Sequence, residues 1–128
     1  MMNAAILLVE DDQASLELAA YLLEHYGFQV FRAEDGLQGL NTALGLGADL
    51  DLILSDIQMP EMDGYQLLRA LRADPLLACL PVVAITAFSM EGDEQEILQA
   101  GFNGYISKPI DPERFVDQVR EWLPSDNP

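Results

Sequence analysis

The sequence predicts an α/β domain with a doubly wound, three-layer (βα)5 fold around a parallel five-stranded sheet. Short apolar runs alternate with longer stretches of helical spacing, and this alternation is typical of parallel sheets covered by helices on both faces. Several of these runs are apolar throughout, as expected of strands buried on both sides. The predicted strands are Ile6–Val9, Phe28–Arg32, Leu52–Ser55, Val82–Thr86 and Gly104–Ser107.

Each predicted strand is followed by a stretch with apolar residues three or four positions apart, which predicts a helix. The predicted helices are Ala14–His25, Leu37–Leu46, Tyr65–Ala73, Asp93–Ala100 and Pro112–Leu123. The first should be capped by Asp12 and end near Gly27, and the last should be capped by Asp111. With right-handed crossovers, these helices cover both faces of the sheet.

The bulk composition predicts a single domain, residues 1–128, with a core from about 4 to 123. At 128 residues, half of them hydrophobic, the chain can bury a proper core, which argues against disorder. The longest apolar runs are too short to cross a membrane, and the first residues lack the basic segment of a signal peptide. The single cysteine, Cys79, excludes an intramolecular disulfide and fits a cytoplasmic location.

The formal net charge of -16 limits the classes of partner. A field of this sign repels nucleic acids and anionic membrane surfaces, and the sequence contains no cluster of lysine and arginine to oppose it. Divalent cations and other proteins remain plausible partners. Most of the carboxylates are expected to serve solubility alone.

Polar side chains follow the first, third, fourth and fifth predicted strands. Glu10–Asp12 follows the first strand, Asp56 the third, and Lys108, the only lysine in the chain, the fifth, while Thr86 ends the fourth. In an open parallel sheet, ligands bind at the carboxyl ends of the strands. We therefore expect these residues to form one site.

The residue types at this edge point to phosphoryl chemistry. Clustered carboxylates repel one another, so they need a cation, and a few carboxylates with waters suit Mg²⁺. An aspartate such as Asp56 can attack a phosphoryl donor to give an aspartyl-phosphate. Lys108 and Thr86 can then contact the phosphoryl oxygens. An acidic strand end alone is often only a solvated loop, and it is the combination that indicates a site.

In their order and spacing, four motifs resemble the receiver domains of two-component response regulators, the CheY-like superfamily. They are Leu8–Asp12, Asp56–Pro60 followed by Met62–Gly64, Ile85–Ala87, and Tyr105–Pro109. The resemblance extends from residue 6 to residue 123. The segment after Thr86 and the Tyr-Ile-Ser-Lys-Pro-Ile sequence are most similar to stand-alone DivK-type receivers and to receivers of hybrid kinases.

The resemblance implies the strand order 2-1-3-4-5 and a role for each site residue. Asp56 would be the phosphoacceptor. Glu10, Asp11, Asp56 and the backbone carbonyl of Gln58 would bind Mg²⁺, or Mn²⁺ in its place. The Mg²⁺ ion would be required for phosphorylation.

Further residues would respond to phosphorylation. Thr86 would move toward the phosphoryl group, Tyr105 would rotate inward, and Lys108 would hold the phosphoryl group. The bond between Lys108 and Pro109 would be cis, which is uncommon for X-Pro bonds in general. Tyr105 also has a simpler interpretation as a core aromatic.

The lifetime of the phosphorylated form would depend on Gln58 and Phe88, two positions after Asp56 and Thr86. The bulk of Phe88 should shield the phosphoryl group from water, which predicts a long-lived form. The protein would not be an enzyme beyond self-phosphotransfer and slow autodephosphorylation.

The resemblance also implies the partners. A sensor histidine kinase or a histidine phosphotransfer protein would donate the phosphoryl group, and a downstream protein would bind the face made by the fourth helix, fifth strand and fifth helix. Neither nucleic acid nor membrane is an expected partner. His25, at the end of the first helix, is expected to complement the helix dipole and not to take part in catalysis.

Three alternatives remain. A Mg²⁺-dependent phosphohydrolase of the haloacid dehalogenase type also uses an aspartate after a strand, but its second aspartate is replaced here by Gln58. A flavodoxin-like nucleotide binder would need a glycine-rich loop after the first strand, where Glu10–Asp12 stands. The chain could also be the receiver part of a larger regulator or hybrid kinase.

Overall fold

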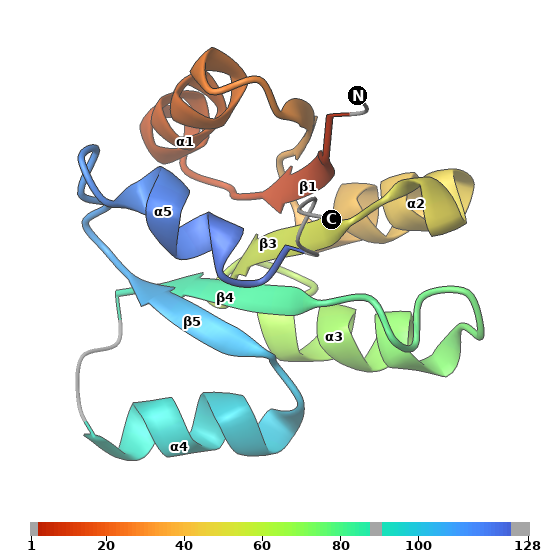
Figure 1. Cartoon of the computed structure of the whole chain (residues 1–128). Helices are drawn as coiled ribbons and strands as arrows, with labels where there is room; N and C mark the ends of the chain where they lie inside the picture. Colours follow the sequence, from red (N-terminus) through yellow and green to blue (C-terminus); the bar gives the residue numbers. More distant parts are fainter. Residues whose placement is uncertain (1–2, 88–90, 124–128) are drawn as a thin grey trace.

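A parallel five-stranded sheet forms the centre of the molecule (Figure 1). The computed structural model describes residues 3–87 and 91–123. The strands are β1 (Ala5–Val9), β2 (Gln29–Ala33), β3 (Leu52–Asp56), β4 (Val82–Thr86) and β5 (Gly104–Ser107). Their order is β2-β1-β3-β4-β5, which confirms the predicted fold class and strand order.

Helices cover both faces of the sheet. They are α1 (Gln13–His25), α2 (Gly36–Leu46), α3 (Gly64–Ala73), α4 (Glu91–Ala100) and α5 (Phe115–Arg120), with a short 3-10 turn, η1, at Gly47–Asp49. Helices α1 and α5 lie together on one face, and α2 and α3 lie together on the other, the face that α4 also covers (Figure 1). None of the helices in the described part of the chain is long and apolar enough to span a membrane.

Two apolar cores hold the three layers together. All residues of β1, β3 and β4 are buried, so alternate side chains enter opposite cores. Leu7 and Ile53 pack on the α2–α3 side, whereas Leu8 and Leu54 pack on the α1–α5 side with Phe115. Burying one such side chain contributes about 1.5–3 kcal/mol to the stability of the folded state, so the two cores together fix the position of the sheet.

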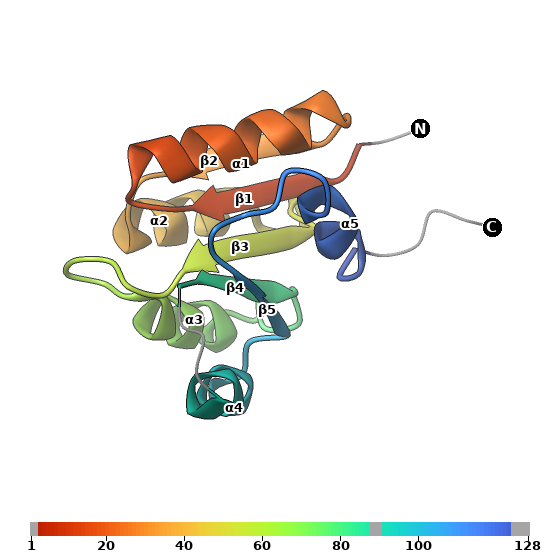
Figure 2. The same ribbon diagram turned by 90° about the vertical axis from the view of Figure 1, so that its left-hand side faces the viewer.

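The strand register aligns the residues that follow the strands. Val9 pairs with Ser55, so Glu10 lies next to Asp56, and Thr86 pairs with Ser107, just before Lys108. Figure 2 shows β1 and β3 ending on the same side of the molecule.

Side-chain caps fix the beginnings of α1 and α3. The Asp12 carboxylate accepts a hydrogen bond from the Ser15 amide at 2.9 Å, which confirms the predicted cap. Asp63 and Gln66 form a reciprocal capping box at the start of α3. Both caps lie at the end of the sheet where the strands terminate, so they also fix the chain near the site.

The last helix is shorter than predicted: it runs from Phe115 to Arg120 and not from residue 112 to 123. The Asp111 carboxylate accepts from the amide of Glu113, and the Asp111 carbonyl accepts from the amides of Arg114 and Phe115, so a turn that Asp111 caps precedes the regular helix. At the other end, the Trp122 amide donates to the carbonyl of Val119, so the last turn is tighter than an α-helix.

Candidate functional site

Four polar residues from four different strand ends meet at the carboxyl edge of the sheet. Asp56 and Thr86 are the last residues of β3 and β4, while Glu10 and Lys108 directly follow β1 and β5. Glu10, Asp56 and Thr86 are buried, with 3%, 8% and 1% of their surface exposed. Polar groups that are buried this close together need hydrogen-bond or ion-pair partners.

Lys108 connects two of the carboxylates. Its Nζ atom lies 2.6 Å from Oε1 of Glu10 and 3.0 Å from Oδ2 of Asp56. The Lys108 side chain is about one-fifth exposed. A single ammonium thus offsets part of the charge of two buried carboxylates.

Backbone hydrogen bonds fix the same carboxylates. The amide of Asp12 donates to Oε2 of Glu10 at 3.1 Å, and the amide of Gln58 donates to Oδ1 of Asp56 at 3.3 Å. The amide of Lys108 donates to the carbonyl of Thr86, which extends the β4–β5 pairing past the strand end. The Lys108–Pro109 peptide bond is cis, the isomer that the resemblance implied.

The electrostatic environment favours a proton or a cation at Glu10. The pKa of Glu10 is raised to about 7, mainly by burial and also by the nearby Asp56, against the opposing effect of Lys108. For Lys108, burial alone would lower the pKa, but the contacts with Glu10 and Asp56 outweigh burial and raise it. Lys108 is therefore charged over the whole physiological pH range.

Three carboxylates of the site could hold a metal ion. Glu10, Asp11 and Asp56 each place one oxygen within 4.8 Å of the others, and Asp11 is exposed to solvent. An all-oxygen set of a few carboxylates that leaves room for water is what Mg²⁺ prefers. These residues fit that ion.

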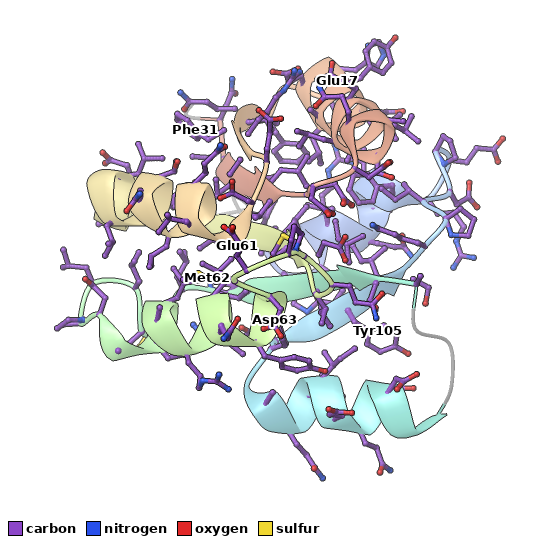
Figure 3. All side chains as sticks on the ribbon, turned by 180° about the vertical axis from the view of Figure 1, so that it is seen from behind. Glu17, Phe31, Glu61, Met62, Asp63 and Tyr105 are labelled. Carbon is purple, nitrogen blue, oxygen red and sulfur yellow. The ribbon has the colours of Figure 1, made fainter. Side chains whose placement is uncertain are left out.

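The loop between β3 and α3 closes one side of the site. Figure 3 shows Glu61, Met62 and Asp63 on this loop. Gly64 packs so tightly behind it that a Cβ atom would lie 2.6 Å from the carbonyl oxygen of Asp56. Gly64 also donates to the carbonyl of Ile57 at 2.8 Å. Only glycine fits this close approach, which holds the backbone after Asp56 in place.

A hollow of about 500 Å³ opens beside this loop, next to the site. It is lined by Ile57, Gln58, Met59, Pro60, Asp63 and Tyr65. Gln58 is exposed, so its side chain is available at the entrance to Asp56.

Tyr105 lies on β5, the edge strand that leads to Lys108 (Figure 3). Its side chain is half-buried against the core under α2 and α3. Interaction with the Glu94 carboxylate of α4 and burial raise the pKa of the Tyr105 hydroxyl. Tyr105 therefore interacts with Glu94 of α4.

The structure thus brings together Glu10, Asp11, Asp56, Thr86 and Lys108, as the strand-end argument predicted. Phe88, for which the sequence predicts a role in tuning hydrolysis, lies outside the described residues. Sequence reasoning missed the direct bond from Lys108 to Glu10. The same strand-end argument could have found it, since Glu10 is the first residue after β1 and β1 lies next to β3.

Comparison with known proteins shows the family of this chain. The sequence profile described as the response regulator receiver domain matches residues 6–120. The chain belongs to this family. It is a receiver domain of two-component signal transduction, with the CheY-like fold.

Relatives of this receiver cover nearly its whole length. It is 39% identical to the polar-differentiation response regulator DivK of Brucella ovis over 122 residues, which are 95% of this chain and 98% of DivK. The chemotaxis response regulator CheY4 of Vibrio cholerae superposes with a TM-score of 0.89 at 27% identity, over 95% of this chain and 100% of CheY4.

A third relative was solved with a metal ion. The receiver domain of a sensor histidine kinase from Pseudomonas aeruginosa has a TM-score of 0.86 and 32% identity, over 97% of this chain and 100% of that domain. Its structure holds a magnesium ion coordinated in the active site cleft.

Proposed function

We propose that this receiver is a Mg²⁺-dependent switch in which Asp56 accepts a phosphoryl group from a histidine kinase or a histidine phosphotransfer protein. The observation that carries the proposal is the meeting of Asp56 with Lys108 and Glu10 at the carboxyl edge of the sheet. An aspartate, a cation and a second carboxylate in contact are the parts that an acyl-phosphate site needs.

Asp56 is the nucleophile in this proposal. One carboxylate oxygen attacks phosphorus, the bond from phosphorus to the donor nitrogen breaks, and the donor histidine leaves as the neutral imidazole after taking up a proton. Oδ1 accepts a hydrogen bond from the Gln58 amide, and Oδ2 accepts one from Lys108. These bonds hold the carboxylate in one orientation and so favour attack from a fixed direction.

Glu10, Asp11, Asp56 and the carbonyl of Gln58 would hold Mg²⁺. When bound, the ion neutralises charge on the phosphoryl oxygens. The solved magnesium complex of the Pseudomonas aeruginosa receiver supports this assignment. The raised pKa of Glu10 supports it too, because a carboxylate that resists ionisation alone ionises readily beside a cation.

Lys108 and Thr86 are proposed to bind the transferred phosphoryl group. Lys108 already contacts Asp56, so its ammonium can move from the free carboxylate to a phosphoryl oxygen over a short distance. Thr86 is buried at the end of β4, one residue past Ile85, which pairs with Asp56, and its hydroxyl can approach a second oxygen. We propose that Tyr105 then leaves its position near Glu94 and rotates inward.

This rotation would change the face formed by α4, β5 and α5, where a downstream protein would bind. We propose a single receiver domain with a core of about residues 4–123, located in the cytoplasm.

The haloacid dehalogenase alternative has less support. It requires a second carboxylate two positions after the nucleophile to act as general acid and base, and Gln58 stands there. We therefore propose that the phosphorylated form turns over slowly and by self-catalysis alone.

Phosphotransfer profiling tests this proposal. Purified, autophosphorylated histidine kinases of the source organism are mixed briefly with the receiver, and transfer of label is followed on gels. We expect rapid transfer from one or a few kinases to the wild type and none to Asp56→Asn. Equal labelling of both proteins would contradict the assignment of Asp56.

A further inference from the structure

Arg72, in the last turn of α3, binds two separate loops at once. It is half-buried, and both of its terminal nitrogens are used. In the α3–β4 loop, Nη1 donates to the carbonyls of Leu77, Ala78 and Leu80, at 3.5, 3.2 and 2.7 Å. In the α4–β5 loop, Nη2 donates to the carbonyl of Gly101 at 3.2 Å and to Oδ1 of Asn103 at 2.9 Å. One side chain therefore joins the α3–β4 loop to the α4–β5 loop.

The acceptors of Arg72 are all neutral. Within residues 3–87 and 91–123, Arg72 takes part in no salt bridge. Its role is thus geometric, because a planar guanidinium can serve several carbonyls in fixed directions and a lysine ammonium cannot.

Asn103 extends this connection to the sheet. The side-chain Oδ1 atom of Asn103 accepts hydrogen bonds from Arg72 and from the backbone amide of Val82, both at 2.9 Å. The backbone amide of Asn103 donates to the backbone carbonyl of Val82 at 2.8 Å. Val82 is the first residue of β4, and Asn103 immediately precedes β5. Beside it, Phe102 is buried and its ring packs edge-on against Tyr65. The C-terminal end of α4 is therefore tied to α3, β4 and β5.

Toward its start, α4 buries little apolar surface, and its Glu94 side chain interacts with Tyr105 of β5. Among its side chains at positions 93–100, only that of Ile97 is buried. The helix packs mainly against β5 and lies at the edge of the molecule, beyond α3 (Figures 1 and 2). Gly101, with a φ of +114°, ends the helix just before the Asn103 connection.

We propose that Arg72 and Asn103 form a fixed pivot about which α4 moves. Local opening costs least where few apolar side chains are buried, so the motion should grow from Ala100 toward the start of the helix. The β4–β5 register, which aligns Thr86 with Ser107, stays fixed during this motion. If the proposed function holds, the pivot lets the α4 surface change while Lys108 keeps its place, but the pivot itself does not depend on phosphorylation.

Amide hydrogen exchange of the unmodified full chain, followed by NMR, tests the pivot. In the wild type, exchange along α4 should be slowest near Ala100 and faster toward Asp93, with the amides of Val82 and Asn103 protected. In Arg72→Met, these two amides should exchange at least about tenfold faster, relative to the slowest core amides. Arg69→Met, on the same helix and with the same charge loss, should leave them unchanged.

Variants at the other residue of the pivot sharpen the test. Asn103→Asp keeps the oxygen that accepts from Arg72 and Val82, so the amide of Val82 should stay protected from exchange. In Asn103→Ala, which lacks this oxygen, that protection should be lost. Arg72→Lys should behave like Arg72→Met. If Arg72→Met does not fold, Arg72→Lys and Asn103→Ala carry the comparison. Uniform exchange along α4 in the wild type, or unchanged protection in these variants, would overturn the proposal.

Discussion

The Nζ atom of Lys108 lies 2.6 Å from Oε1 of Glu10, closer than its distance of 3.0 Å from Oδ2 of Asp56. The lysine therefore compensates a carboxylate of the proposed metal site as well as the proposed phosphoacceptor. Lys108 and a divalent cation compete for these carboxylates, because both positive charges are attracted to the same oxygens. This competition determines how metal binding should respond to substitution and to pH.

Replacing Lys108 by alanine should leave Mg²⁺ binding at its original strength or increase it. The variant loses a competing cation, while its carboxylates remain in place. Without metal it should be less stable by about 1–3 kcal/mol, because Glu10 and Asp56 lose a charged hydrogen-bond partner. Titration calorimetry and urea unfolding measure the two effects.

Arg114→Ala is the matched control for Lys108→Ala, since it removes one positive charge from an exposed position just before α5. It should change neither quantity appreciably. Complete loss of Mg²⁺ binding in Lys108→Ala would show that the lysine organises the carboxylates and does not compete for them.

Mg²⁺ affinity should depend on pH through Glu10. The pKa of this group is raised from 4.5 to about 7, so the folded, metal-free protein holds a proton there that the unfolded chain releases. Stability without metal should therefore fall as pH rises from about 4.5 through about 7. Since Mg²⁺ must displace that proton, its affinity should rise over the same range and level off above it.

Calorimetry in two buffers of different ionisation enthalpy measures this proton release directly. Glu10→Gln has no proton to release, so its Mg²⁺ affinity should be weaker and nearly flat across the range. An affinity in the wild type that does not change between about pH 6 and about pH 8 would contradict the role of Glu10.

Gly64→Ala should damage the site from behind. The added Cβ would lie 2.6 Å from the Asp56 carbonyl oxygen and 2.8 Å from the Cα atom of Ile57, so the backbone after Asp56 must shift. We expect a loss of about 1–3 kcal/mol in stability, as for other overpacked sites, and slower phosphorylation. Gly45→Ala is the control, because nothing lies within 4 Å of a Cβ there. Equal behaviour of the two variants would refute this account of the loop.

Phosphorylated receiver should decay faster when Phe88 is replaced. This prediction comes from the sequence: an aromatic side chain two positions after Thr86 has bulk to exclude water and no polar atom to orient it. Decay of labelled protein should accelerate in Phe88→Ala and in Phe88→Glu. Slower decay in both variants would refute shielding, and unchanged decay would assign Phe88 to partner binding.

The site could be predicted from the sequence because its residues follow buried parallel strands. Runs such as Leu52–Ser55 have few alternatives to a central strand, and parallel strands bring their carboxyl ends to one edge. The strand pattern alone therefore places Asp56, Thr86 and Lys108 together.

The role of Arg72 could not be predicted in the same way. Its acceptors are mostly backbone carbonyls of two loops, and no side-chain pattern identifies a carbonyl that points at a guanidinium. The ends of α5 were missed for a related reason. The turn at 112–114 and the tight turn after Arg120 differ from the regular helix only in backbone hydrogen bonds, which the apolar pattern does not encode.

The central claim is that Asp56 is phosphorylated and that Mg²⁺ is required. Intact-mass spectrometry after incubation with acetyl phosphate tests both parts in one measurement. We expect the mass of one added phosphoryl group in the wild type with Mg²⁺, none with EDTA, and none in Asp56→Asn under either condition. Full labelling of Asp56→Asn, or labelling of the wild type that is indifferent to EDTA, would contradict it.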